Sequence, residues 1–263
     1  MLGATRVFAR ARGRQCGLAL RRASSAPAVP GSSLQADPKF VDASRGEGLE
    51  IGAADAVVFP DAISQEEHDA LVEEILHGAS DRAMRKFRKR KYQEDHWDAV
   101  IVGYKEIERA MPLWPPALAS VLQRMQDFVQ RYLEEHVERV NGPLEYLPPH
   151  IIDLAADGEI RPHVDSIKFS GEVVAGLSLL STRTMSLRKG RDDPHAYTKD
   201  EPAVDLLLPP RSLYILCNRA RFDMGHSVER VDPPERRFSI IFRDAIPIDK
   251  ENDPSSFLSR HIV

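Results

Sequence analysis

The chain is poor in cysteine and has no long hydrophobic run. Its 263 residues include two cysteines, Cys16 and Cys217, too few for a disulfide framework or a cysteine-based zinc site. The most apolar stretch, Val173 to Leu180, is far shorter than the ~18 residues that a membrane-spanning helix needs, so no membrane span is expected. Hydrophobic residues make up 42% and charged residues 29% of the chain, which is typical of a globular domain with a full core.

Acidic residues are absent from the start of the chain, and the first is Asp37. The preceding stretch holds six arginines among Leu, Val, Phe, Ala and Ser, without the continuous apolar core of a secretory signal. This composition predicts a mitochondrial transit peptide, placed at residues 1–24, with a disordered basic tail as the alternative. Residues 25–50 are rich in Ala, Pro, Ser and Gly and are expected to be a flexible linker. The domain would then span 51–250, followed by a C-terminal tail at 251–263.

The first half of the domain predicts two helices that flank a basic stretch. Ser64 and Glu67 have the spacing of a capping box, which predicts a helix ending near Gly78. A second helix is expected over 115–137, because its apolar residues recur on one face. Between the helices, residues 82–91 contain seven basic side chains. We expect a solvated loop there; the alternative is that this stretch and the aromatic residues after it bind nucleic acid.

The second half changes to short apolar segments separated by turn residues. These segments predict strands, with turns at Asp157-Gly158 and Pro209-Pro210 and a charged insert at 182–203. Helices followed by many short strands predict an α+β fold, mainly β, in which a β-sandwich or jelly roll is supported by helices on one side. The expected strands are 56–59, 146–154, 173–180, 204–208, 212–216 and 236–244.

Three side chains offer the ligands of a mononuclear iron site. His163 and Asp165 lie two residues apart, so in an extended chain both side chains point to the same face. Together with His226 they could occupy one face of an octahedral Fe(II) and leave three positions open, as in non-haem iron oxygenases. A His-x-Asp sequence by itself is more often a hydrogen-bonded pair, and the downstream residues favour the metal site.

Two other His-x-acid sequences compete with this assignment. His136 and Glu138 lie at the end of a predicted helix, where residues two apart point in different directions, so they are expected on the surface. His96 and Asp98 could be combined with His150 and Arg161, at a similar spacing further along the chain. The long helix predicted between them occupies the place where a barrel needs strands, which argues against this second set.

Arg237 and Arg243 share one face of the last predicted strand. They alternate with Phe238, Ile240 and Phe242, whose face must belong to the core. In an ordinary sandwich the arginine face would look at water, whereas in a jelly-roll barrel it can face a ligand inside. Two buried arginines would need an anion, and a guanidinium binds a carboxylate through two parallel hydrogen bonds. A dicarboxylic cosubstrate would satisfy them.

The same stretches resemble the AlkB family of iron(II)/2-oxoglutarate dioxygenases over roughly residues 55–245. The final strand is similar to that family's Arg-x-Asn-x-Thr-x-Arg, with Ser239 and Ile241 in place of Asn and Thr. The other resembling stretches are Arg161-Pro-His-Val-Asp-Ser-Ile-Lys-Phe169 and Gly176-Leu-Ser-Leu-Leu-Ser181. Those most similar to the family's mitochondrial member are Asp95-His-Trp-Asp-Ala99 and Ser212-Leu-Tyr-Ile-Leu216.

The resemblance implies a double-stranded β-helix fold and an enzyme that oxidises a C–H bond. Its cofactor would be Fe(II) and its cosubstrates 2-oxoglutarate and O2, with release of succinate and CO2. Arg237 would hold the far carboxylate of 2-oxoglutarate, Tyr214 would donate a hydrogen bond to it, and Arg243 would complete the anion site. The iron ligands that the resemblance implies are His163, Asp165 and His226.

The substrate is less closely indicated. The stretch that matches the nucleotide-recognition lid of the family's demethylases, about 80–112, is short and highly charged. Loss of residues 1–24 would change the formal charge from −4 to −10, which disfavours nonspecific binding of nucleic acid. A protein side chain is therefore the expected substrate. The alternatives are methylated bases in mitochondrial RNA, favoured by the basic and aromatic residues at 82–104, and a metal-binding interaction module without turnover. The resemblance to the mitochondrial group implies location in the matrix and a link to alkylation-induced necrosis and fatty-acid metabolism.

Overall fold

Strands make up most of the regular structure of the computed structural model, as the sequence predicts. The structure describes residues 36–78, 81–94, 100–138, 140, 142–168 and 170–246. The transit peptide expected at 1–24, the tail expected at 251–263, and His96 with Asp98 lie outside these residues. The elements in chain order are η1 (Pro38–Phe40), β1 (Val41–Arg45), β2 (Ala56–Phe59), α1 (Gln65–His77), α2 (Arg82–Lys89), β3 (Ile101–Glu108), η2 (Met111–Leu113), α3 (Pro116–His136), β4 (His150–His163), β5 (Val174–Leu179), β6 (Arg183–Lys189), β7 (Ala203–Leu208), β8 (Leu213–Leu216), α4 (Asn218–Phe222), β9 (Met224–Val228) and β10 (Arg237–Arg243).

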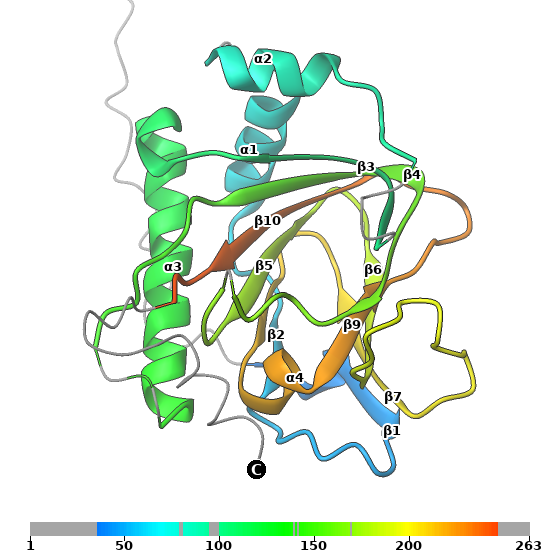
Figure 1. Cartoon of the computed structure of the whole chain (residues 1–263). Helices are drawn as coiled ribbons and strands as arrows, with labels where there is room; N and C mark the ends of the chain where they lie inside the picture. The colour runs from blue at the N-terminus through cyan, green and yellow to red at the C-terminus, as the bar shows by residue number, and fades with distance from the viewer. Residues whose placement is uncertain are drawn as a thin grey trace, which may run out of the picture. The chain divides into compact units, whose positions relative to one another are not determined.

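The strands form one antiparallel sheet that closes most of the way into a barrel (Figure 1). The order of neighbouring strands is β1-β7-β6-β9-β4-β10-β5-β8-β2. The remaining strand, β3, is not part of this order and pairs with β4. The long strand β4 joins the two halves, because its first residues, from His150 to Leu154, pair with β10. Its end pairs with β9 instead, where His163 lies opposite His226. This topology is the jelly roll that the sequence predicts.

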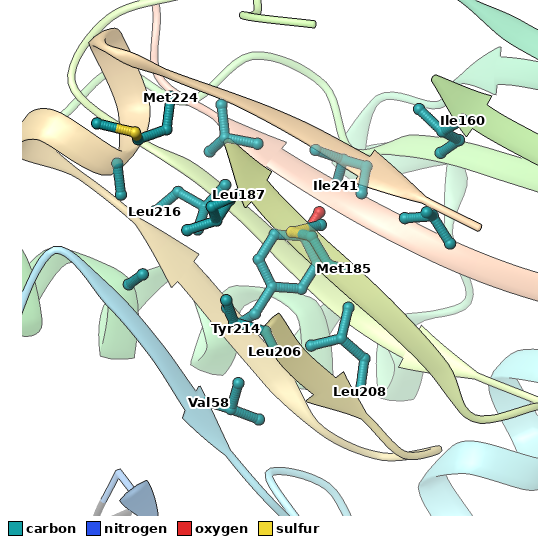
Figure 2. Packing of buried hydrophobic residues seen from close by; sticks show 14 of the residues in the cluster. Val58, Ile160, Met185, Leu187, Leu206, Leu208, Tyr214, Leu216, Met224 and Ile241 are labelled. Carbon is teal, nitrogen blue, oxygen red and sulfur yellow. The ribbon is translucent and has the colours of Figure 1, made fainter. Parts of the chain in front are cut away.

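The interior of the barrel is filled by side chains from both halves of the sheet. Met185 and Leu187 of β6 pack in the same cluster as Tyr214 of β8 and Ile241 of β10 (Figure 2). Tyr214 and Ile241 are 3% and 4% exposed, so the face of β10 that carries its arginines points inward. The alternative that this face looks at water is therefore wrong.

The two predicted helices, α1 and α3, form as expected and lie outside the barrel beside β2 and β5 (Figure 1). Ser64 and Glu67 form the predicted capping box at the start of α1. The α3 helix packs on β2, where the rings of Phe59 and Phe128 meet edge to face at 4.8 Å. Among the described residues no helix is both long and apolar enough to cross a membrane.

The basic stretch at 82–91 is a helix for most of its length, not the expected loop. The α2 helix begins at Asp81, whose side chain accepts a hydrogen bond from the backbone N–H of Met84. Met84 and Phe87 are buried, and these two apolar residues, three positions apart, are the only sign of the helix in a run of cations. Arg88 donates to backbone carbonyls at the end of α1, so one of the basic residues stabilises the fold.

Three further expectations are corrected. Residues 36–50 of the expected linker contain β1, which pairs with β7 from Val41 onward. The charged insert expected at 182–203 begins with β6, which lies between β7 and β9. Asp157-Gly158 lies within β4 and makes no turn. Gly158 is needed there for a close approach between strands, since a Cβ atom on it would lie 2.6 Å from the carbonyl oxygen of Gly103.

Candidate metal centre and cosubstrate site

The three predicted metal ligands meet at one end of the barrel. The antiparallel pairing of β4 and β9 places the rings of His163 and His226 side by side, with centroids 4.3 Å apart. Asp165 follows the end of β4, and its Oδ1 lies 3.2 Å from Nε2 of His163 and 3.9 Å from Nε2 of His226. The candidate ligand atoms all lie within 4.8 Å of one another, which is close enough for one ion to reach all three.

The hydrogen bond of His163 and the pKa values of His226 and Asp165 suit metal binding, which requires an imidazole nitrogen without a proton and an ionised carboxylate. Nδ1 of His163 lies 2.9 Å from the carbonyl oxygen of Arg161, so Nδ1 carries the proton and Nε2 is left as a ligand. Burial, helped by the neighbouring His163, lowers the pKa of His226 to about 3. Burial alone would raise the pKa of Asp165, but Arg243 and the two histidines hold it well below its usual range.

A pocket of about 1320 Å³ opens over the cluster, and His163, Asp165 and Arg243 form part of its wall. Arg243 was expected to complete the cosubstrate's anion site. In the structure its Nε donates to Oδ2 of Asp165 at 2.6 Å, and its Nη1 lies 3.1 Å from Nδ1 of His150. Arg243 therefore belongs to the site, but its contacts there are with a candidate ligand and a neighbouring histidine.

Arg237 lies deeper in the barrel and is 2% exposed. Its Nη2 donates to Oγ of Ser178 at 3.2 Å, while its Nε has no hydrogen-bond partner in the described part of the chain. Burial lowers the pKa of Arg237 to about 10, only partly offset by Tyr214. No carboxylate pairs with this guanidinium among the described residues, and a buried cation without a counterion costs several kcal/mol. The arrangement therefore fits a cosubstrate that brings a carboxylate to this place.

Two further residues for which the sequence predicted no role, Ser239 and Gly176, contribute to this interior site. Ser239 lies two residues after Arg237 on the same face of β10, and its buried Oγ also has no hydrogen-bond partner among the described residues. Gly176 lies opposite Tyr214 in the pairing of β5 with β8, and a Cβ atom at this position would overlap the tyrosine ring. Burial raises the pKa of Tyr214 to about 12, so the phenol keeps its proton and can donate a hydrogen bond. Of these two residues, only Ser239 had a signal in the sequence, its shared parity with Arg237; the place of Gly176 depends on the register of β5 with β8.

Comparison with known proteins agrees with this geometry. Residues 55–243 match the family model of the 2OG-Fe(II) oxygenase superfamily. A mouse (Mus musculus) protein, alpha-ketoglutarate-dependent dioxygenase alkB homolog 7, mitochondrial, is 38% identical over 201 residues, 72% of this chain and 78% of its own length. The cattle (Bos taurus) protein of the same name is 37% identical over 201 residues, 72% of this chain and 77% of its own. The chain thus belongs to the AlkB family of 2OG-Fe(II) oxygenases, and it is a dioxygenase that uses Fe(II), 2-oxoglutarate and O2.

Solved structures support the fold alone. OsALKBH1 has a TM-score of 0.51 at 11% identity, covering 74% of this chain and 100% of the solved one. A prolyl-4-hydroxylase from Pseudomonas putida has a TM-score of 0.51 at 13% identity, covering 73% of this chain and 93% of the solved one. The predicted fold class, a mainly β jelly roll of the double-stranded β-helix type with supporting helices, is confirmed.

Proposed function

We propose that this dioxygenase holds its iron through His163, Asp165 and His226 and oxidises a C–H bond of a protein side chain in mitochondria. The observation that carries the ligand assignment is the convergence of three ligand atoms within 4.8 Å of one another. Bound iron and 2-oxoglutarate supply an oxidative decarboxylation that consumes O2, releases succinate and CO2, and places one oxygen atom in the substrate's C–H bond.

The chain's own residues bind and orient the participants. Arg237 holds the far carboxylate of 2-oxoglutarate through its fork of donors, and the hydroxyls of Ser239 and Tyr214 add hydrogen bonds around the same anion. Arg243 keeps Asp165 ionised and in place. The apolar interior around Tyr214 and Ile241 excludes water, which strengthens these charge interactions.

A protein substrate is supported by the position of the basic helix. No residue of α2 is part of the pocket wall in the portion of the chain that the structure describes, so α2 does not form a lid over the site. The alternative, a methylated base in mitochondrial RNA, is favoured by the exposed basic side chains of the same helix. Location in the mitochondrion is supported by the names of the two mammalian relatives and by the composition of residues 1–24. Within the mitochondrion, the proposed compartment is the matrix. We extend the proposal to a role in alkylation-induced necrosis and fatty-acid metabolism.

Succinate formation by the purified chain tests the proposed ligand set. With Fe(II), 2-oxoglutarate and O2, the wild type should form succinate, and His163→Ala or Asp165→Ala should abolish it. The exposed His195 provides a matched control, since His195→Ala should behave as the wild type. Unchanged turnover in either ligand variant would refute the assignment.

The substrate class needs a second experiment, which compares mitochondria with and without the chain. Mass spectrometry should find a peptide whose gain of one oxygen atom depends on the chain. A change confined to methylated bases in mitochondrial RNA would favour the alternative instead.

A further inference from the structure

Glu106, His150 and Arg243 form a chain of contacts that ends on Asp165. Oε2 of Glu106 lies 3.0 Å from Nε2 of His150, and Nδ1 of His150 lies 3.1 Å from Nη1 of Arg243. The Nε of Arg243 then donates to Oδ2 of Asp165 at 2.6 Å. All four side chains are part of the wall of the pocket, so the chain runs along one side of the place where substrate would bind.

The register of three neighbouring strands brings these residues together. His150 opens β4 and pairs with Glu108 of β3 on one side and with Ile241 of β10 on the other. Glu106 lies two residues before Glu108 in β3, and Arg243 lies two residues after Ile241 in β10. Because side chains alternate along a strand, Glu106 and Arg243 are on the same face of the sheet as His150. The imidazole of His150 thus lies between the carboxylate of Glu106 and the guanidinium of Arg243, and 18% of the His150 side chain is exposed.

The hydrogen-bonding partners of His150 determine which of its ring nitrogens donates and which accepts. A guanidinium has N–H donors and no acceptor, so Nδ1 of His150 must accept from Arg243 through its lone pair. A neutral ring then carries its proton on Nε2, where it donates to Glu106. Both nitrogens are used, each in one role, and the ring cannot turn over without losing both contacts.

The same contacts divide the two oxygens of Asp165 between different roles. Oδ2 accepts from Arg243, whereas Oδ1 faces Nε2 of His163 at 3.2 Å. An arginine side chain has many rotamers, and holding it in one costs conformational entropy. The acceptor on His150 favours the rotamer in which Nε of Arg243 reaches Oδ2, and this leaves Oδ1 directed at the two imidazoles.

We propose that His150 is a positioning residue for the metal centre: it holds Arg243, and through Arg243 it orients the carboxylate of Asp165. This inference rests on the proposed ligand set of His163, Asp165 and His226. Residues that orient metal ligands typically contribute 10–100-fold to metal affinity, so the expected effect is large enough to measure. Glu106 supports the ring from the far side and acts one step further away.

Three substitutions at His150 separate its two nitrogens. Phe keeps the ring volume and removes both contacts. The amide oxygen of Asn lies near the place of Nδ1 and can still accept from Arg243. The longer Gln reaches the place of Nε2, so it can contact Glu106 but offers Arg243 no acceptor at the right position. We expect His150→Phe and His150→Gln to weaken metal binding by about 10–100-fold, and His150→Asn to restore most of it.

The measurement is anaerobic titration of the full chain with Co(II), used as a spectroscopic probe, in competition with a coloured chelator. The Co(II) absorption spectrum gives a second readout, because it responds to the orientation of the carboxylate. His163→Ala provides the reference for loss of a ligand, and the exposed His77 of α1 provides the control variant His77→Phe. Glu106→Gln should remain near wild type, because its amide oxygen still accepts from Nε2 of His150.

The outcomes are distinct. Weak binding in the Phe and Gln variants, with recovery in the Asn variant, supports the inference. Wild-type affinity in all three, while His163→Ala binds poorly, overturns the positioning role and leaves the metal site intact. Equal weakness of Asn and Gln would also overturn it, since loss of a shared local structure, not of the acceptor, would then explain both. A wild-type chain that takes up no Co(II) would refute the proposed site itself. The comparison of Asn with Gln decides the question even if the Phe variant does not fold.

Discussion

Two consecutive arginines at the start of β10 have opposite environments: Arg236 comes just before the strand, and Arg237 is its first residue. Arg236, on the outer face, donates to both oxygens of Asp153 at 2.8 and 2.7 Å. Asp153 is fully buried and also accepts from the hydroxyl of Tyr92 at 3.0 Å and pairs with Lys105 at 3.2 Å. Arg237, on the inner face, has one hydrogen bond to a serine and no carboxylate partner among the residues that the structure describes.

The difference separates a structural ion pair from a candidate binding site. On the outer face the chain supplies both the cations and the anion, so the network is complete in the folded protein. On the inner face it supplies a cation and two hydroxyl groups, of Ser239 and Tyr214, and leaves the counterion to a ligand. Buried charge is tolerated in proteins when it is paired, so a functional explanation is needed for the environment of the unpaired Arg237, which faces the proposed cosubstrate site.

Loss of the outer anion should have the largest effect on folding. Asp153→Ala leaves the cations around it without a counterion, and breaking a buried pair in this way costs about 3–5 kcal/mol. The free energy of unfolding from urea titration would measure it. Glu50→Ala serves as a control, because Glu50 pairs with Arg219 at the exposed surface, where such pairs contribute little. Equal stability of the two variants would show that the outer network is not structural.

Filling the inner site should stabilise the wild type by a somewhat smaller amount. The test uses the Fe(II)-loaded protein without O2. Addition of 2-oxoglutarate at a hundred times the dissociation constant of 2-oxoglutarate should add about 2.7 kcal/mol to the free energy of unfolding. At the same concentrations Arg237→Met should gain much less, because it cannot bind the far carboxylate. Equal stabilisation of the two proteins would place the cosubstrate elsewhere.

In the absence of ligand, Arg237→Met should leave the free energy of unfolding unchanged or raise it, whereas Asp153→Ala should lower it. Replacement of a buried, unpaired charge by an apolar side chain is neutral or stabilising, here by about 1 kcal/mol. Thermal unfolding in the absence of metal and 2-oxoglutarate would measure it. A loss as large as that of Asp153→Ala would mean that Arg237 has a structural partner and is no ligand site.

The smallest expected change is at Tyr92, whose hydroxyl donates to Asp153. Tyr92→Phe keeps the ring and removes one of several hydrogen bonds to the carboxylate, which should cost about 0.5 kcal/mol. Succinate formation should stay at the wild-type rate, because this network lies on the outer face of the sheet. Reduced turnover at unchanged stability would show that the two faces are coupled.

Much of the site could be predicted because successive side chains along a strand point to opposite faces of the sheet. His163 and Asp165 share a parity, as do Arg237 and Arg243, and the aromatic residues between the two arginines show which face is core. The meeting of His226 with His163 could only be inferred from ligand chemistry, since it depends on the pairing of β9 with β4.

What could not be predicted has physical reasons. All five residues of β9 are buried, so both of its faces are covered and the strand shows no alternation. β6 begins with a buried Arg183. Because charged residues usually lie at the surface, the charged side chains of this stretch predicted an exposed insert instead of a strand. The role of His150 depends on the register of three strands, and no spacing along the chain reveals which residues such a register brings together.

We have proposed a single metal site, formed by His163, Asp165 and His226, that binds iron beside a 2-oxoglutarate held by Arg237. Anaerobic titration with Fe(II) and 2-oxoglutarate, followed by the metal-to-ligand charge-transfer absorption of the chelate, tests it most directly. We expect a saturable band in the wild type, no band when any of the three ligands is replaced by Ala, and saturation at higher 2-oxoglutarate in Arg237→Met. A band of undiminished intensity in a ligand variant, or none in the wild type, would contradict it.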